Sequence, residues 1–447
     1  MSGSTYLLKG GTIVNEGKIF HADILIENSF ITRIDNNIQH PHAPEINVEG
    51  LHILPGVIDD QVHFREPGLT HKANIATEAA AAVAGGTTSF MEMPNTNPAA
   101  LTQELLQDKY DIAAKTSLAN YSFFMGTSND NLSEVLKTNP KNVCGVKIFM
   151  GSSTGNMLVD NEKTLRNLFS NVSMLIAAHC EDEQTVRDNL EKAREQYGDN
   201  IPANQHPVIR SDKGCYKSTD LAFQLAREYK TRFHVLHIST AIETALMSNE
   251  KLTKEKLITS EVCVHHLHFS EKDYAQKGHL IKCNPAIKFE SDRDALWTAL
   301  LDDRLDIIAT DHAPHTWNEK QQEYTKSPSG LPLVQHSLVM MLNYVKSGKI
   351  SLEKVVEKMS HAPAICFNIE KRGFIREGFK ADLAIVDLNH SWKVQKDNIL
   401  YKCGWSPLEG ETMSAKVIHT FVSGQPALFH GELQTNIRGE RLTFDRN

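Results

Sequence analysis

Residues 305–315 read LDIIATDHAPH, a short apolar run followed at once by an aspartate and two histidines. Such runs are typical of strands that are buried on both faces of a parallel sheet. Residues 174–182 (MLIAAHCED) and 233–240 (FHVLHIST) show the same pattern, an apolar run followed by a histidine and further polar residues. In a parallel α/β barrel the carboxyl ends of all strands lie at one face, so the polar side chains that follow these runs would meet in one cavity.

The middle of the chain alternates between strand-like and helix-like segments. The clearest helix covers residues 74–84, is rich in alanine and is stopped by Gly85-Gly86. Eight such units predict an α/β fold, a (β/α)8 TIM-like barrel. A doubly wound open sheet would fit the alternation too, but ligand-type residues after strands 1, 4, 5, 6 and 8 favour the barrel. The predicted strands are 57–62, 87–91, 120–124, 145–149, 174–178, 233–236, 257–262 and 306–309.

Both ends of the chain are rich in short β-like runs. Residues 22–26 and 381–386 are examples, and glycine pairs and Ser-Gly steps punctuate the runs as turns. We expect the two ends to pair in a small β-sandwich beside the barrel. The predicted domains are residues 1–53 as the N-terminal part of the sandwich, 54–370 as the barrel, and 371–447 as the C-terminal part of the sandwich.

The composition excludes several classes of protein. Hydrophobic residues make up 40% and charged residues 23%, as in ordinary globular proteins. A net charge of −8 argues against a nucleic-acid partner. No apolar run approaches the roughly 20 residues that span a bilayer, and we expect neither a membrane partner nor a signal peptide. The seven scattered cysteines predict buried free thiols and a cytoplasmic location.

Five ligand-type residues at the ends of different predicted strands indicate a metal site with two ions. One histidine after a strand would mean little among the 21 of this chain, but five such residues are hard to explain otherwise. Zinc prefers histidine nitrogen and carboxylate oxygen. Cys180, beside His179, is a weaker candidate for a soft ligand. The five are His63, Lys147, His179, His237 and Asp311.

Lys147 is the unusual member, because an ammonium group has no lone pair and cannot bind a cation. It could instead pair with a carboxylate. Alternatively, its neutral amine could react with CO₂ and form a carbamate, whose two oxygens can bridge two metals. A pair of metals about 3.5–4 Å apart can hold and acidify a water. Asp311 would bind one metal, accept the proton of the attacking hydroxide as general base, and return it to the leaving nitrogen.

Around these residues the chain resembles the amidohydrolase superfamily and, within it, the dihydroorotase family. The resemblance covers nearly the whole chain and is carried by residues 63–68 (HFREPG) and 93–98 (MPNTNP), with residues 373–383 similar to the family's return into the small β-domain. It implies a zinc hydrolase of cyclic amides with one or two Zn²⁺ per chain. The reaction it implies is the interconversion of N-carbamoyl-L-aspartate and (S)-dihydroorotate in pyrimidine (UMP) biosynthesis.

The resemblance also implies which residues hold the substrate. In the family, the residues that match Arg65 and Asn95 hold the substrate's carboxylate, as a guanidinium fork and an amide donor should. Asn284, His315 and Gly330 match further substrate contacts. Allantoinases are similar to this chain but typically have asparagine where Arg65 stands, and hydantoinases have neither segment.

One residue departs from the family pattern. The first metal motif of the family is His-x-His, and here residues 61–63 read Gln-Val-His. By the resemblance, Gln61 and His63 would serve one metal, His179 and His237 the other, and Lys147 would bridge them. An amide oxygen is a poorer zinc ligand than an imidazole, so we expect a weaker first site.

Three hypotheses about function follow. The first is an enzyme of the dihydroorotase family. The second is an allantoinase or another cyclic ureide hydrolase. The third, motivated by Gln61, is an inactive homologue that serves as the structural partner of a carbamoyltransferase. The family resemblance also implies a homodimer.

Overall fold

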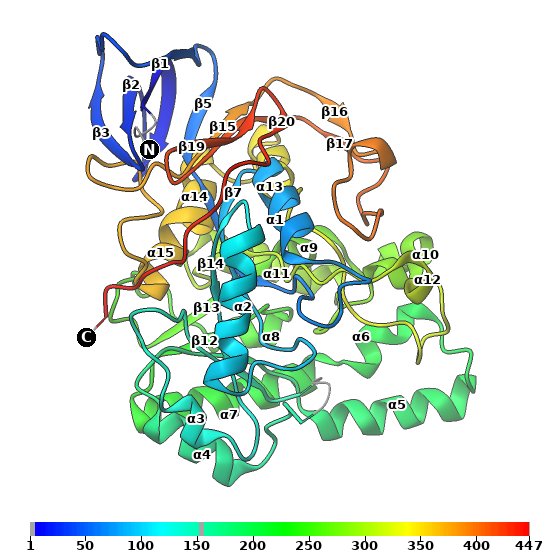
Figure 1. The fold of residues 1–447 in the computed structure, drawn as a ribbon. Coiled ribbons are helices and arrows are strands. Elements are labelled where there is room, and N and C mark those ends of the chain that lie inside the picture. The colour runs from blue at the N-terminus through cyan, green and yellow to red at the C-terminus, as the bar shows by residue number, and fades with distance from the viewer. Residues whose placement is uncertain (1–4, 152–155, 447) are drawn as a thin grey trace.

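The computed structural model describes residues 5–151 and 156–446; residues 1–4, on which the expectation of no signal peptide partly rests, lie outside them. Parallel strands form a barrel at the centre of the molecule (Figure 1). Its strands are β6 (Val57–Val62), β7 (Thr87–Glu92), β8 (Asn120–Phe123), β9 (Met125–Gly126), β10 (Val146–Phe149), β11 (Ile176–His179), β12 (Phe233–Val235), β13 (Ile258–Cys263) and β14 (Ile307–Ala309).

The barrel consists of two sheets that meet at two seams. One sheet runs β6-β7-β8 and the other β9-β10-β11-β12-β13-β14, and at the first seam β9 begins two residues after β8 ends. At the opposite seam the His63 N–H donates to the His312 carbonyl at 2.7 Å, and Val62 and His312 form a parallel bridge. All eight predicted strands are present to within two residues at each end, so the predicted barrel is confirmed. The short strand β9 was not predicted separately.

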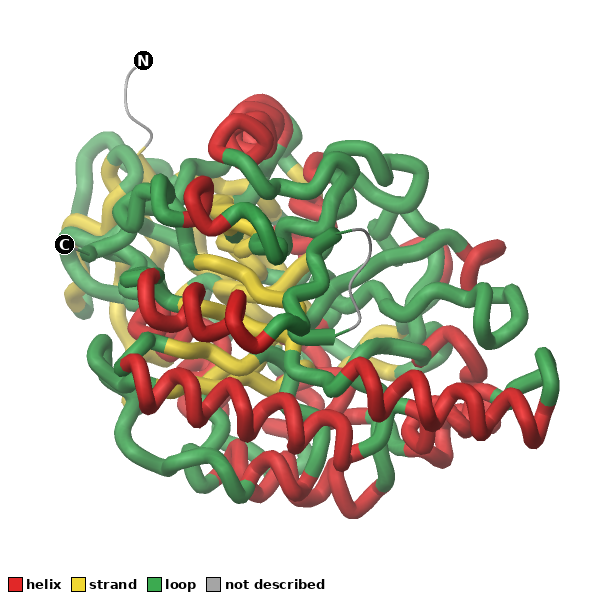
Figure 2. The backbone as a smooth tube through the Cα atoms, turned by 90° about the horizontal axis from the view of Figure 1, so that it is seen from below, coloured by secondary structure: helices red, strands yellow, loops and turns green. Residues whose placement is uncertain are grey.

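Helices surround the strands, which occupy the middle of the molecule in Figure 2. The predicted alanine-rich helix begins after Asn74, whose side chain accepts the N–H of Thr77 in a capping box, and ends at Gly85. The α-helices are α1 (Ile75–Ala84), α2 (Gln103–Thr116), α3 (Leu132–Val135), α4 (Glu162–Asn171), α5 (Glu183–Tyr197), α6 (His206–Ile209), α7 (Asp212–Tyr229), α8 (Ala241–Thr244), α9 (Val264–His268), α10 (Tyr274–Lys277), α11 (Glu290–Leu301), α12 (Trp317–Lys320), α13 (Ser337–Lys346), α14 (Leu352–Val356) and α15 (Ala362–Phe367). Shorter turns are η1 (Ala203–Gln205), η2 (Glu271–Asp273), η3 (Gly278–Ile281), η4 (Glu357–His361) and η5 (Lys396–Asn398).

The two chain ends build one β-sandwich beside the barrel, as expected. Strand β5 from the N-terminal end pairs antiparallel with β15 from the C-terminal end, and side chains such as Ile13 and Phe421 share one buried core. The strands are β1 (Thr5–Asn15), β2 (Lys18–Glu27), β3 (Phe30–Asp35), β4 (Glu45–Asn47), β5 (His52–Pro55), β15 (Leu383–Asp387), β18 (Lys416–Val422), β19 (Gln425–Phe429) and β20 (Glu432–Leu433), with β16 (Trp392–Lys393) and β17 (Thr412–Met413) as a separate pair.

Parts of the C-terminal segment leave the sandwich and contact the barrel. The indole N–H of Trp405 donates to the His315 carbonyl at 2.8 Å. Near the end of the chain, Leu442 and Phe444 are buried in one apolar cluster with barrel residues, and Arg446 donates to the Cys144 carbonyl at 2.8 Å. The prediction placed all of residues 371–447 in the sandwich and did not contain these contacts; the domain boundaries stay a prediction.

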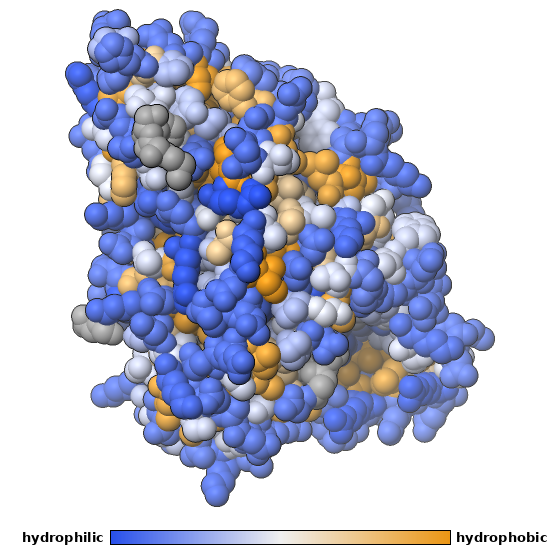
Figure 3. Space-filling model, in the orientation of Figure 1, coloured by the Kyte–Doolittle hydropathy of each residue, from blue (hydrophilic) through white to orange (hydrophobic). Residues whose placement is uncertain are grey.

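The surface and the thiols agree with the composition. The face shown in Figure 3 is mostly hydrophilic, with apolar residues in separate small patches. In the described ranges no helix is long and apolar enough to cross a membrane. All seven cysteines are free and six of them are buried, as predicted.

Candidate active site

A small polar cavity of about 80 Å³ lies where the barrel strands end. Every predicted site residue except His315 lines it, and His315 lies behind the wall with its Nε2 atom 3.0 Å from Nη2 of Arg65. The structure therefore brings together side chains that are far apart in the sequence. The lining residues are Gln61, His63, Arg65, Asn95, Lys147, Phe149, His179, His237, Asn284, Asp311, Ala313, Ser329 and Gly330.

Three of these residues have a left-handed backbone. The φ angle is 70° at Arg65, 38° at His237 and 46° at Asp311. Residues other than glycine seldom adopt this conformation, which costs about 1–3 kcal/mol and persists where surrounding structure imposes it. The two strand ends and the loop after β6 are thus bent so that these three side chains turn into the cavity.

Two histidines face each other on one side of the cavity. His179 ends β11, and its Nδ1 lies 3.0 Å from Nε2 of His237, which follows β12. The other ring nitrogen of His179 donates to Glu181 at 2.8 Å. Burial lowers the pKa of both imidazoles, well below the usual value for His237, so both are neutral at pH 7. A histidine oriented by a carboxylate, with its other nitrogen free, is the arrangement found in metal ligands.

His63 and Asp311 form the opposite side. The Nδ1–H of His63 donates to the Asn95 side-chain oxygen at 2.8 Å, and its Nε2 lies 3.1 Å from the Asp311 carboxylate. Burial lowers the pKa of His63, which favours the neutral ring. Its Nε2 lone pair and the carboxylate then point at each other, and a cation between them would satisfy both.

Lys147, the second residue of β10, is fully buried between these two pairs. Its amine has no hydrogen-bond partner within residues 5–151 and 156–446, and it lies 4.4 Å from the centre of the Phe149 ring. Burial lowers its pKa to about 7. The structure shows no carboxylate paired with it among those residues, so the alternative of a simple ion pair is not supported. A buried amine that is neutral at pH 7 can react with CO₂.

The donor set therefore fits a metal centre. The imidazoles of the set are neutral, the Asp311 carboxylate faces His63, and the buried Lys147 amine has no hydrogen-bond partner among the described residues. Gln61 also lines the cavity, and its side-chain oxygen lies 3.8 Å from the thiol of Cys263. Cys180, the weaker thiol candidate, is directed at Met150 and does not line the cavity.

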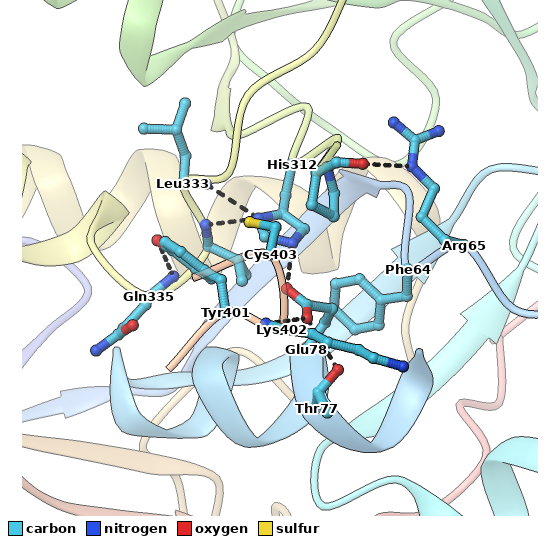
Figure 4. A network of polar contacts seen from close by, with 12 residues as sticks. Phe64, Arg65, Thr77, Glu78, His312, Leu333, Gln335, Tyr401, Lys402 and Cys403 are labelled. Atoms are coloured by element: carbon cyan, nitrogen blue, oxygen red, sulfur yellow. Dashed lines mark hydrogen bonds and ion pairs between the residues drawn. The ribbon is translucent and has the colours of Figure 1, made fainter. Parts of the chain in front are cut away.

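Asp311 is positioned by its neighbours in the chain. The adjacent His312, shown in Figure 4, donates from Nε2 to Glu78 at 2.8 Å and accepts the Leu333 N–H at Nδ1 at 3.0 Å. On the other side, the Thr310 hydroxyl donates to Asp59 at 2.6 Å. Both flanking side chains are buried and bonded, so the loop that carries Asp311 is held on both sides.

Arg65 is a buried cation with an unusual environment. Its Nε donates to the Pro314 carbonyl at 3.1 Å, and burial lowers its pKa to about 10, so it stays charged at pH 7. In the part of the chain that the structure describes, no carboxylate lies within ion-pair distance of it. A buried charge without a counter-ion is costly, and an anion bound in the cavity would compensate it.

Residues 315–330, the segment over the site, have a polar composition that is typical of an exposed loop, yet buried side chains anchor them. Lys320 is buried in α12, and its amine donates to the carbonyls of Lys282, Pro328 and Gly330 at 2.9–3.1 Å. Gly330 has a φ of +138°, and a Cβ there would lie 2.5 Å from the Ala313 carbonyl. The segment is therefore anchored by Lys320, whose side chain turns inward to donate hydrogen bonds to main-chain carbonyls.

Several residues of the site were missed from the sequence. Phe149, Ala313 and Ser329 line the cavity. Glu181 orients His179, and its place two residues after that histidine is a signal that could have identified it. Although burial opposes it, the charge of Arg210 and the hydrogen bond from His179 lower the pKa of Glu181, so it remains a carboxylate. Nothing in the sequence around Phe149, Ala313 and Ser329 indicates that these residues line the cavity.

The comparisons with known proteins agree with one another on the family. Residues 52–427 match the model of the amidohydrolase family. The chain is 32% identical to a dihydroorotase of Pyrococcus abyssi over 97% of each chain. It is 29% identical to an allantoinase of Deinococcus radiodurans over 98% of each chain. Among solved structures, an L-hydantoinase from Arthrobacter aurescens has a TM-score of 0.91 at 24% identity and covers 97% of this chain and 98% of its own.

Proposed function

The chain belongs to the amidohydrolase family, and on that basis we propose that it is a dihydroorotase. It would interconvert N-carbamoyl-L-aspartate and (S)-dihydroorotate, closing or opening a six-membered cyclic amide. The relatives named dihydroorotase support this member of the family, and the allantoinase relative makes hydrolysis of another cyclic ureide the alternative.

The buried guanidinium of Arg65 carries the proposal. Dihydroorotate and N-carbamoyl-L-aspartate bear a carboxylate that allantoin and hydantoin lack. Nearby carboxylates such as Asp311 and Glu92 act on Arg65 only from beyond ion-pair distance, and the substrate carboxylate would supply the direct ion-pair contact. The side-chain oxygen of Asn95 accepts the hydrogen bond from His63, so the amide N–H groups of Asn95 could donate to the substrate. The buried side-chain oxygen of Asn284 has no hydrogen-bond partner among the described residues and could accept a ring N–H.

The histidine pairs and Asp311 would hold one or two Zn²⁺, with a carbamate on Lys147 between them. A bound metal would supply an acidic water and polarise the ring carbonyl. The carbamate forms when the neutral Lys147 amine adds to CO₂ and loses a proton to solvent. Its burial favours the reaction, because a pKa of about 7 leaves a large fraction of the amine unprotonated near pH 7.

Asp311 would move the proton of the reaction. As a water oxygen adds to the ring carbonyl, the carboxylate accepts the water's proton. When the carbon–nitrogen bond breaks, it returns that proton to the leaving nitrogen. The left-handed backbone at Asp311 and the bonded residues beside it hold the carboxylate on the cavity wall for both transfers.

Replacing Arg65 tests the proposal. Arg65→Gln removes the charge but keeps a polar side chain, and kcat/KM for dihydroorotate should fall about 100-fold to 1,000-fold, mostly through KM. Slow turnover of hydantoin, which has no carboxylate, should change less than about 3-fold, and the metal content should stay the same. The exposed Arg33→Gln is the matched control. An equal loss for both substrates, or an unchanged KM for dihydroorotate, would contradict the assignment.

A further inference from the structure

A second group of potential metal ligands lies at the end of β13, apart from the five ligand-type residues of the proposed centre. Cys263 is the last residue of that strand, and His265 and His266 belong to the helix α9 that follows. All three are buried, and one ligand atom of each lies within 4.8 Å of the other two. A thiol and two imidazoles at this spacing are a typical zinc donor set.

The two imidazoles have unused nitrogens. The Nε2–H of His266 donates to the Pro285 carbonyl at 3.1 Å, and its Nδ1 has no hydrogen-bond partner among the described residues. The backbone of Thr310 interacts with the His265 ring and opposes the effect of burial on its pKa, but neither ring nitrogen of His265 has a partner at hydrogen-bonding distance and angle among the described residues. Buried polar atoms without partners are rare because they cost about 1–3 kcal/mol each. A histidine that donates one N–H to a carbonyl and keeps the other nitrogen free is oriented as metal ligands are.

Both rings are also in the protonation state that ligation requires. Burial lowers the pKa of His266 to about 4 and that of His265 well below its usual value, so both are neutral at pH 7. Burial raises the pKa of the Cys263 thiol, so the sulfur would lose its proton only as a metal binds it.

Gln61, the residue that departs from the family's motif, faces this group. Its side-chain oxygen lies 3.8 Å from Cys263 Sγ. Two ligands of one tetrahedral zinc, a sulfur at about 2.3 Å and an oxygen at about 2.1 Å, lie about 3.6 Å apart. The observed separation is close to that value. Gln61 therefore has a place in this group that does not require it to replace a histidine in the other centre.

We propose that Cys263, His265, His266 and the side-chain oxygen of Gln61 form a separate metal site for a borderline-soft cation such as Zn²⁺. On binding, a metal–sulfur bond forms and the thiol proton passes to solvent. The site would fix Gln61 at the edge of the catalytic cavity and tie β6 to β13. It goes beyond the proposed function, because it does not depend on which substrate the enzyme hydrolyses.

X-ray absorption at the zinc edge tests the site on the full-length, zinc-loaded protein without any substitution. A sulfur scatterer at about 2.3 Å is expected beside the nitrogen and oxygen ligands. A shell of nitrogen and oxygen alone would overturn the proposal, whatever the enzyme's activity. In that case the thiol donates only a weak hydrogen bond to Gln61.

Matched serine variants then assign the sulfur. Cys263→Ser should abolish the sulfur signal and bind about one equivalent of zinc less than the wild type. Cys180→Ser, which removes a buried thiol beside His179, should keep both. Cobalt-loaded protein gives an independent readout, since a thiolate ligand produces a charge-transfer band that should vanish in Cys263→Ser alone. A sulfur signal that survives Cys263→Ser, or is lost in Cys180→Ser, would overturn the assignment.

Discussion

Burial lowers the pKa of two nitrogen bases in the cavity, but from different starting values and with different results at pH 7. Burial brings the pKa of the Lys147 amine to about 7, so a large fraction is neutral and nucleophilic. The Arg65 guanidinium keeps a pKa of about 10 and stays charged. Because a lysine can lose its proton and an arginine cannot, one suits reaction with CO₂ and the other suits binding of an anion. The proposed function depends on this difference, because it needs a neutral amine at Lys147 and a cation at Arg65.

Lys147→Ala should remove the bridging anion. We expect the bound metal to fall from its wild-type content and kcat for dihydroorotate to drop at least about 100-fold, because two metals then share fewer anionic ligands. Acetate, whose two oxygens resemble those of a carbamate, should restore part of both. The exposed Lys213→Ala is the control. Metal content measured by mass spectrometry that stays at the wild-type value would contradict the bridging role.

At the scale of elements, the segment from α12 to Gly330 covers one side of the site. Three hydrogen bonds from one buried lysine hold this segment against the loop around Lys282 and the chain at Gly330. Ser329 and Gly330 line the cavity, so the position of the segment sets the shape of the site. A lysine in this role is not recognisable from sequence, since lysines in polar stretches are usually exposed.

Lys320→Met should release this segment. The substitution leaves the carbonyls of Pro328 and Gly330 without this donor, and the Lys282 carbonyl keeps only the Gly330 N–H; the loss should cost about 2–4 kcal/mol of unfolding free energy in urea titrations. It should also raise KM for dihydroorotate, because Gly330 would lose its anchor. The exposed Lys326→Met, in the same segment, should change stability by less than about 0.5 kcal/mol. Equal stability of the two variants would show that the contacts of Lys320 are not needed.

The strands and the ligand-type residues could be predicted from the sequence because both have local signals. A buried strand is a short apolar run, and a site residue either ends it, as His179 does, or follows it, as Asp311 does. Contacts between distant residues have no such signal. The thiol of Cys263 opposite Gln61 and the inward turn of Lys320 depend on the closure of the barrel. The substrate residues were predicted by resemblance, and their roles stay a prediction.

At the scale of the whole molecule, the two chain ends meet in one sandwich and the C-terminal segment returns to the barrel. This packing buries many polar groups, among them neutral histidines outside the site. His336 is one example: its Nδ1 lies 2.8 Å from the Tyr401 hydroxyl, and burial lowers its pKa to about 3. The fold therefore depends on these rings staying unprotonated.

The stability of the protein should fall as the pH is lowered from about 6.5. An unfolded histidine binds a proton near pH 6.5, whereas folded His336 does so only near its pKa of about 3. Between these values the unfolded state binds more protons, so each such ring lowers the unfolding free energy by up to about 1.4 kcal/mol per pH unit. Urea midpoints at pH 7, 6 and 5 should show a smaller loss for His336→Gln than for the wild type. The exposed His71→Gln should follow the wild type; identical slopes for all three would contradict this account.

The most direct test of the central claim is the initial rate of (S)-dihydroorotate hydrolysis by the purified, zinc-loaded protein with bicarbonate present. Allantoin and hydantoin are assayed on the same sample, and its metal content is determined. We predict that kcat/KM for dihydroorotate exceeds the other two values at least about 100-fold, because only dihydroorotate offers a carboxylate to Arg65. Faster turnover of allantoin or hydantoin, or no turnover of dihydroorotate by the metal-loaded protein, would contradict the claim.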